Sequence, residues 1–234
     1  MGEFDGKHCV VTGGTGALGS AVVARILELG GSCAVPVYDE SELDGFAHAS
    51  DDRVALTVGV DLADESAATS FYADVSSSGL WASVHVAGGF AMSGITETSL
   101  DDLRAMMAKN AETCFVCCRE AVRAMRAAGS GGRIVNVSAR PAVQPCGGML
   151  AYQMSKAAVA SLTQGLAEEV KDDGILVNAV LPSIMDTPAN RDAMPDADFD
   201  AWPKVEQVAE AMCFLASPGN ALTSGALVPV YGMA

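Results

Sequence analysis

The chain has 234 residues, the length of one α/β domain, and half of them are hydrophobic although aromatic residues are scarce. Its net charge of −15, from 29 acidic and 14 basic residues, argues against a surface for nucleic acid or an anionic membrane. The sequence shows neither a charged leader before an apolar stretch nor an apolar run of membrane-spanning length, so we expect a cytoplasmic protein with no membrane partner.

Apolar, β-rich stretches alternate with helix-patterned stretches along the whole chain. This alternation predicts a single-domain Rossmann fold over residues 1–234, a doubly wound parallel sheet of about seven strands with helices on both faces. The predicted strands cover residues 8–12, 32–38, 53–61, 81–89, 132–139, 175–183 and 224–232. The predicted helices cover residues 20–30, 65–77, 99–129, 151–174 and 204–217, and a capping box of Ser99 and Asp102 starts the third.

A glycine-rich loop, TGGTGALGS at residues 12–20, joins the first strand directly to the first helix. Gly14, Gly16 and Gly19 spell GxGxxG within the strand–turn–helix context that a dinucleotide-binding loop requires. Unpaired backbone N–H groups and the helix dipole suit a pyrophosphate there, and glycines let the backbone approach it closely. The residues expected to contact the dinucleotide in this loop are Gly13, Thr15, Gly16, Leu18 and Gly19.

Acidic residues follow the second and third strands, where the adenosine end of a dinucleotide should lie. Asp39 could accept hydrogen bonds from the ribose hydroxyls, which favours NAD over NADP, although a gapless count places the usual acidic position nearer Val37. Asp61, with Leu62 after it, is placed to meet the adenine amine; its simpler interpretation is the N-cap of the next helix.

Seven cysteines, an odd number that lies mostly in apolar segments, indicate reduced thiols rather than a disulfide framework. In CFVCC, Cys114 and Cys117 have the spacing of metal ligands, but no second Cys/His pair lies nearby in the sequence. We therefore interpret these cysteines as core positions of a helix and predict no metal.

The stretch AYQMSKAAV places Tyr152 and Lys156 four residues apart, on one face of a predicted helix. A free tyrosine has a pKa of about 10, and an ammonium one turn away should lower it by favouring the phenolate. Such a phenol could exchange a proton with a substrate while a nicotinamide carries a hydride, so we expect Tyr152 to be a general acid/base.

With the glycine loop and this Tyr–Lys pair together, the chain resembles the short-chain dehydrogenase/reductase family nearly end to end. HVAGG, residues 85–89, resembles the NNAG turn of the family, with His85 replacing its first asparagine. The resemblance implies an NAD(P)-dependent oxidoreductase acting on a small or medium alcohol or ketone, with Asn110 of MAKNAETCF anchoring a proton relay. It further implies dinucleotide contacts from Val86, Ala87, Gly88, Tyr152, Lys156, Pro182, Ile184 and Thr187.

One departure from the family pattern concerns the catalytic serine, which normally lies thirteen residues before the tyrosine. That position is Ala139 here, and Ser138 beside it points to the other strand face unless the strand bulges. We keep Ser138 as a candidate catalytic donor. The Pro- and Asp-rich segment 183–203 is expected to be a lid over the substrate.

Two alternatives stay open. The missing serine and the lid resemble the dihydropteridine reductase branch of the family, which would imply a quinonoid pterin substrate. The chain could also be a dinucleotide-binding module that has lost its chemistry, although Tyr152, Lys156 and Asn110 argue against this. The resemblance also implies a homodimer or homotetramer that uses the helices around residues 114–127 and Tyr152.

Overall fold

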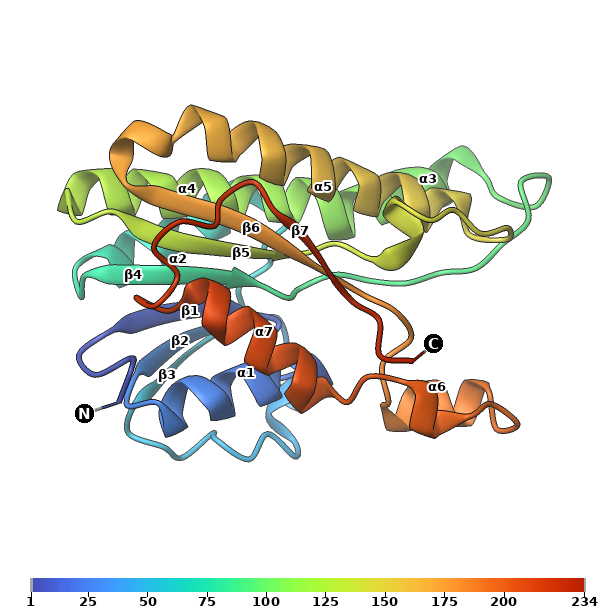
Figure 1. The fold of residues 1–234 in the computed structure, drawn as a ribbon, viewed down its shortest axis with the longest axis horizontal. Helices are drawn as coiled ribbons and strands as arrows, with labels where there is room; N and C mark the ends of the chain where they lie inside the picture. The colour runs from blue at the N-terminus through green and yellow to red at the C-terminus, as the bar shows by residue number, and fades with distance from the viewer. Residues whose placement is uncertain (1, 234) are drawn as a thin grey trace.

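The computed structural model describes residues 2–233 and forms seven parallel strands in the order β3-β2-β1-β4-β5-β6-β7 (Figure 1). Chain order reverses direction between β1 and β4, so their carboxyl ends form the switch point where doubly wound sheets bind ligands. The strands are β1 (His8–Thr12), β2 (Ser32–Val37), β3 (Val54–Val58), β4 (Leu80–His85), β5 (Gly132–Val137), β6 (Ile175–Pro182) and β7 (Leu227–Val230).

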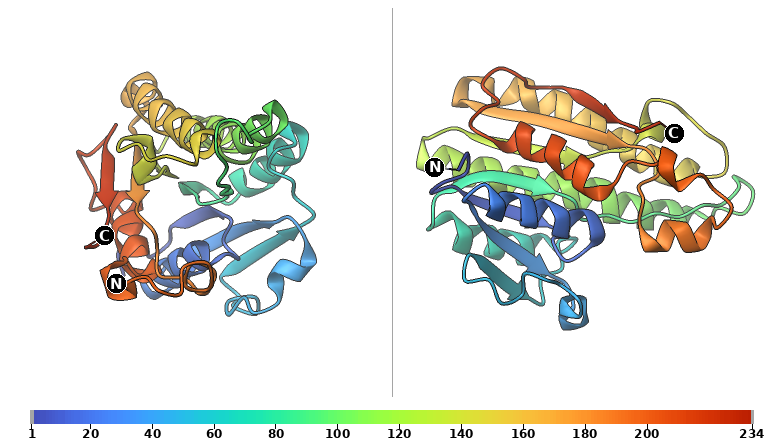
Figure 2. Two further views of the ribbon diagram at one scale, coloured as in Figure 1. Left: turned by 90° about the vertical axis from the view of Figure 1, so that its right-hand side faces the viewer. Right: turned by 60° about the horizontal axis from the view of Figure 1, so that its bottom comes forward.

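Helices cover both faces of this sheet, as two further views confirm (Figure 2). One apolar core lies beneath α1 and α7, and a second lies beneath α2, α4 and α5. The α-helices are α1 (Ala17–Glu28), α2 (Glu65–Ser76), α3 (Leu100–Met106), α4 (Thr113–Ala128), α5 (Leu150–Glu169), α6 (Pro188–Ala193) and α7 (Val205–Ala216). Short turns of helix are η1 (Glu40–Leu43), η2 (Met107–Glu112), η3 (Arg140–Ala142), η4 (Lys171–Asp173) and η5 (Phe199–Ala201). The predicted Rossmann fold is confirmed.

The register of the sheet aligns the ends of the central strands. Thr12 of β1 pairs with His85 of β4, His85 pairs with Asn136 of β5, and Asn136 pairs with Ala179 of β6. β1 and β4 end at Thr12 and His85, and β5 and β6 continue to Val137 and Pro182, so the segments that follow the four strands leave at the carboxyl end of the sheet. The helices α3 and α6 lie at this same end (Figure 1).

The predicted helix over residues 99–129 begins as expected, with the Ser99–Asp102 capping box. It is not uniform, because η2 is a wider, π-helical segment between α3 and α4. Such segments are rare and frequently occur at functional sites. Residues 183–203 also differ from a plain loop, since they contain α6 and η5.

None of the helices formed by residues 2–233 combines the length and the apolar character needed to cross a bilayer.

Candidate active site

The glycine loop between β1 and α1 is shaped by two glycines. Gly13 has a φ of +62°, and a Cβ there would lie 2.8 Å from the backbone nitrogen of Ala87. A Cβ on Gly19 would collide with the carbonyl oxygen of Gly13. Larger residues would therefore push the loop away from β4 and from the start of α1.

The N-terminus of α1 offers the donors that a pyrophosphate needs. The N-cap residue is Gly16, which has no side chain to bond the first N–H groups, and the first turn from Ala17 carries no carboxylate. These N–H groups and the positive end of the helix dipole suit an anion. The loop opens into a hollow of about 370 Å³ lined by Gly13, Thr15, Gly16, Ala17, Leu18, Gly19, Glu42, Val86, Ala87 and Gly88. The donor set and the hollow fit a dinucleotide pyrophosphate.

A second hollow of about 690 Å³ adjoins the first and shares Gly13, Glu42, Ala87 and Gly88 with it. Its other lining residues are Pro36, Tyr38, Val60, Asp61, Leu62, Ala63, Gly89, Ala105, Ala108, Lys109 and Thr113. Asp61 and Leu62 both line this hollow, and a carboxylate oxygen of Asp61 accepts the N–H of Ala63 at 2.9 Å.

Asp39 follows β2, as expected, but its carboxylate has a partner within the protein. Its carboxylate caps η1 by accepting the N–H of Ser41 at 2.9 Å, and Asp39 is not among the residues that line either hollow. Glu42, on the same short helix, lines both hollows and accepts a hydrogen bond from Oγ1 of Thr15 at 2.7 Å. Sequence reasoning missed Glu42, and its only signal was that several acidic residues, Glu42 among them, follow β2.

Asn110 lies in η2 and holds the loop after β4. Its Oδ1 accepts the N–H of Gly89 at 3.0 Å, and its Nδ2 donates to the Gly89 carbonyl at 3.0 Å and to Ser155 Oγ at 3.1 Å. The buried amide therefore joins three elements: the β4–α3 loop, η2 and α5. Asn110 lies next to Gly88, because a Cβ on Gly88 would come within 2.5 Å of its Oδ1.

Tyr152 and Lys156 both belong to α5, and Lys156 borders the same glycine. A Cβ on Gly88 would lie 3.3 Å from Lys156 Nζ. The ammonium donates to the carbonyl of Val137 at 2.9 Å and lies 6.0 Å from the centre of the Tyr152 ring. Phe90 meets Tyr152 edge to face, with ring centres 4.9 Å apart. The predicted pair therefore lies beside the residues that line the two hollows.

The expected effect of Lys156 on the tyrosine is not found. Burial raises the pKa of Tyr152 to about 12, because the phenolate loses more solvation than the phenol. Burial also lowers the pKa of Lys156 to about 8. The prediction that the ammonium lowers the Tyr152 pKa was wrong for this structure, because burial outweighs a charge held 6.0 Å from the ring centre.

Ser138 and Ala139 differ in what they contact. The Ser138 hydroxyl is buried and donates to the backbone carbonyl of Lys156 at 2.8 Å. Ala139, also buried, has no polar side chain to offer. A catalytic role for Ser138 stays a prediction, and this hydrogen bond favours a structural role.

The segment 183–203 is joined to the residues after β7 through Ser183, whose hydroxyl donates to the carbonyl of Tyr231 at 2.7 Å. Other hydrogen bonds hold the segment together internally. Asp186 accepts two hydrogen bonds from Arg191, at 2.6 and 2.8 Å, and its backbone N–H donates to the Pro203 carbonyl. Thr187 caps α6 through its hydroxyl. Among the predicted nicotinamide contacts, Pro182 ends β6 in the core and Ile184 is exposed.

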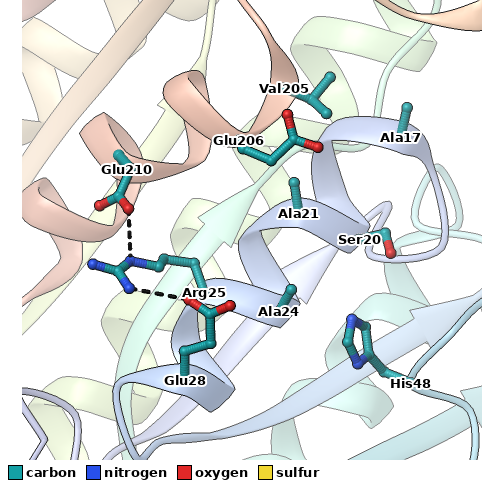
Figure 3. Close-up of a pocket in the computed structure, with 10 residues that line it drawn as sticks. All are labelled: Ala17, Ser20, Ala21, Ala24, Arg25, Glu28, His48, Val205, Glu206 and Glu210. Carbon is teal, nitrogen blue, oxygen red and sulfur yellow. Dashed lines mark hydrogen bonds and ion pairs between the residues drawn. The ribbon is translucent and has the colours of Figure 1, made fainter.

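Another hollow, of about 310 Å³, lies between α1 and α7 (Figure 3). Its one guanidinium, Arg25, forms ion pairs with Glu28 and Glu210, and the carboxylate of Glu206 stands nearby. This acidic lining would repel a phosphate, so the dinucleotide fits the glycine-loop hollows and not this one.

A protein-family model for short chain dehydrogenases matches residues 7–198. The chain is 36% identical over 253 aligned positions to galactitol 2-dehydrogenase of Rhizobium johnstonii, covering 97% of this chain and 95% of that protein. It is 29% identical to 2-dehydro-3-deoxy-L-rhamnonate dehydrogenase (NAD(+)) of a Sphingomonas species, covering 99% and 96%.

Solved structures of short-chain dehydrogenases/reductases are also similar to this chain. A short-chain dehydrogenase/reductase mutant from Serratia marcescens is 30% identical with a TM-score of 0.87, covering 99% of this chain and 98% of that one. A short-chain type enzyme from Mycobacterium ulcerans has a TM-score of 0.91 at 24% identity, which concerns the fold alone.

Proposed function

This chain belongs to the short-chain dehydrogenase/reductase family, and we propose that Tyr152 is the general acid/base of its oxidoreductase reaction on a small or medium alcohol or ketone. A bound nicotinamide dinucleotide supplies or accepts the hydride. The observation that carries the proposal is the position of Gly88. This residue lines both hollows, and Lys156 Nζ and Asn110 Oδ1 lie against it, so the catalytic candidates adjoin the place that fits the dinucleotide.

The chain's own residues would hold the dinucleotide at separate points. The N–H groups from Gly16 onward would bind the pyrophosphate, and the hollow with Asp61 and Leu62 would take the adenosine. Lys156 would bind the nicotinamide ribose. Pro182, Ile184 and Thr187, at the end of β6 and the start of segment 183–203, would contact the carboxamide.

The proton chemistry depends on which form of Tyr152 is present. Neutral pH is far below the Tyr152 pKa of about 12, so the phenol carries its proton. During reduction it can donate this proton to a carbonyl oxygen of the substrate. In the oxidation direction the phenol must first lose this proton, and burial opposes this step. Asn110, fixed by Gly89 and Ser155, would anchor the relay.

A preference for NAD over NADP fits the lining of the hollows. Glu42 lines both hollows, with its carboxylate accepting from Thr15 of the glycine loop. A 2′-phosphate at this place would meet a like charge, whereas ribose hydroxyls could donate to the carboxylate. Lys109 also lines the larger hollow, and its side chain lies against Gly89. The NAD(+) in the name of the Sphingomonas relative supports the same preference.

A second candidate reaction, reduction of a quinonoid pterin, is favoured by one observation. Ala139 occupies the family's serine position, and the Ser138 hydroxyl donates to the Lys156 carbonyl. A substrate carbonyl would therefore lack the serine hydroxyl that donates a hydrogen bond to it in the family pattern. A conjugated quinonoid substrate needs less polarisation of a carbonyl than a simple ketone does.

We further propose a cytoplasmic homodimer or homotetramer assembled through α4 and α5. Phe115 of α4 and Met154 of α5 expose about half of their side-chain surface, which an assembly would cover. Light scattering of the purified chain measures the subunit number, and a monomer at micromolar concentration would refute the assembly.

The oxidoreductase proposal is tested with the purified chain, NADH or NADPH, and a panel of ketones and a quinonoid pterin. We expect dinucleotide oxidation with at least one substrate, faster with NADH. Binding of NADH, followed by fluorescence, without turnover of any substrate would instead identify a binding module.

A further inference from the structure

Two features of the sequence that the proposed reaction does not use come together in the core. One is His85, at the end of β4, and the other is the CFVCC segment at the start of α4. One donor atom from each of His85, Cys114 and Cys118 lies within 4.8 Å of the other two. These side chains are 3, 5 and 1% exposed, respectively. The histidine that the sequence around CFVCC lacks is therefore supplied by a strand 33 residues away.

The distances from Cys118 resemble those of a tetrahedral metal site, and a donor atom of Cys114 lies within 4.8 Å of those of Cys118 and His85. Cys118 Sγ lies 3.5 Å from His85 Nδ1 and 3.4 Å from the Oδ1 of Asn136. With zinc bonds of about 2.05 Å to nitrogen and about 2.3 Å to sulfur, neighbouring ligand atoms lie about 3.6 Å apart. Asn136 Oδ1, which is 2.8 Å from His85 Nδ1, provides a fourth donor after a small separation of these two atoms.

Hydrogen bonds from outside the group hold the ligands in place. His85 Nε2 lies 2.8 Å from Ser83 Oγ and 3.2 Å from the hydroxyl of Tyr72. Asn136 Nδ2 donates to Thr163 Oγ1 at 2.9 Å, which leaves the amide oxygen directed at the group. Metal-bound histidines characteristically bond through their second ring nitrogen in this way, so the ring is already oriented with Nδ1 toward the thiols.

We propose that His85, Cys114 and Cys118, with Asn136 as the fourth donor, form a structural zinc site. Two thiolates and an imidazole select a thiophilic cation over Mg²⁺ or Ca²⁺. On binding, each thiol forms a sulfur–metal bond and releases its proton, so two protons leave per Zn²⁺ and the site gains no net charge. Because the donors are buried, the metal has no open position for substrate; it links β4 to α4, one turn after Asn110.

The test uses the full chain, stripped with a chelator and titrated with Zn²⁺ alone against a coloured competing chelator. We expect about one Zn²⁺ per chain, release of about two protons per metal, and a higher melting temperature. Co²⁺ in place of Zn²⁺ should give the thiolate charge-transfer and tetrahedral d–d absorption bands of a site with cysteine ligands.

Variants separate this site from other thiols. Cys118→Ser and His85→Asn should each weaken Zn²⁺ binding by more than the roughly 10- to 100-fold that outer-sphere changes cause. Cys213→Ser, a buried thiol on α7, and Cys146→Ser, an exposed thiol, should leave the affinity within about threefold of the wild type. Far-UV circular dichroism of each variant verifies that it is folded.

The proposal is overturned if the wild-type chain takes up no stoichiometric Zn²⁺, or if Co²⁺ shows only octahedral, non-thiolate absorption. It is equally overturned if folded Cys118→Ser or His85→Asn binds Zn²⁺ as the wild type does, or if Cys146→Ser alone loses binding. Should Cys118→Ser fail to fold, the His85→Asn titration and the wild-type Co²⁺ spectrum decide the question.

Discussion

Replacing Asn110 by alanine should loosen the loop that borders the proposed dinucleotide site. The amide makes two hydrogen bonds to Gly89, one through its oxygen and one through its nitrogen, and a third to Ser155. Ser155 keeps another partner in the variant, because its hydroxyl also donates to the carbonyl of Tyr152 at 2.7 Å. The two bonds to Gly89 are therefore the loss that matters.

The magnitude follows from these two bonds. Each is worth about 1 to 1.5 kcal/mol in a partly buried setting, so Asn110→Ala should lower the free energy of unfolding by about 2 to 3 kcal/mol. For a chain of this length, 1 kcal/mol moves the melting temperature by roughly 2 to 4 °C, which predicts a fall of roughly 4 to 12 °C. Asn110→Asp keeps an acceptor for the Gly89 N–H but buries a carboxylate against the Gly89 carbonyl oxygen, so its melting temperature should fall at least as far as that of Asn110→Ala.

The assay is thermal unfolding followed by circular dichroism, with urea unfolding for the free energy. A melting temperature of Asn110→Ala within about 1 °C of the wild type would show that the two hydrogen bonds to Gly89 contribute little to stability. A melting temperature of Asn110→Asp close to that of the wild type would also contradict the reasoning, since it would show that the amide donors to Gly89 and Ser155 are not needed.

Three further predictions follow from single residues. Below about pH 8 Lys156 is charged in the folded chain, and its burial destabilises the fold. Between about pH 8 and 10.5 the folded chain has lost this proton while the unfolded chain still binds it, so the stability of the fold rises with pH. Urea unfolding at several pH values measures the free energy of unfolding of the wild type and of Lys156→Met. Over this pH range the wild type should gain up to about 3 kcal/mol of unfolding free energy relative to the variant, and a constant difference between the two would refute the buried-ammonium argument. Ser138→Ala, which removes the bond to the Lys156 carbonyl, should reduce turnover tenfold or less, whereas a loss of two to three orders of magnitude would identify Ser138 as the missing oxyanion donor. Glu42→Gln should narrow the preference for NADH by tightening binding of NADPH, as measured by fluorescence titration; unchanged Kd values for both would remove Glu42 from cofactor selection.

Much of the fold and part of the candidate site could be predicted because their signals are local. The strand–glycine loop–helix unit occupies consecutive residues, and Tyr152 and Lys156 share a helix face by their spacing. The alternation of strands and helices restricts the topology to a parallel sheet, which the structure confirms.

The remaining features depend on contacts that spacing does not encode. Whether Asp39 or Glu42 faces the hollow depends on the turn of η1, and in this structure Asp39 is used as its cap. The pKa of Tyr152 depends on burial by distant segments, including Phe90 on its ring, so neighbouring charge alone gave the wrong direction. His85 and Cys118 meet only because β4 and α4 pack together.

The central claim is that Tyr152 transfers the proton in a nicotinamide-dependent reaction, and Tyr152→Phe tests it most directly because it removes one oxygen. Steady-state turnover with the best substrate of the panel and the Kd for NADH should be measured on the same preparation. We predict that turnover falls at least a thousandfold, on the order of what general acid catalysis supplies, while the Kd changes less than about threefold. Turnover within tenfold of the wild type would contradict the account.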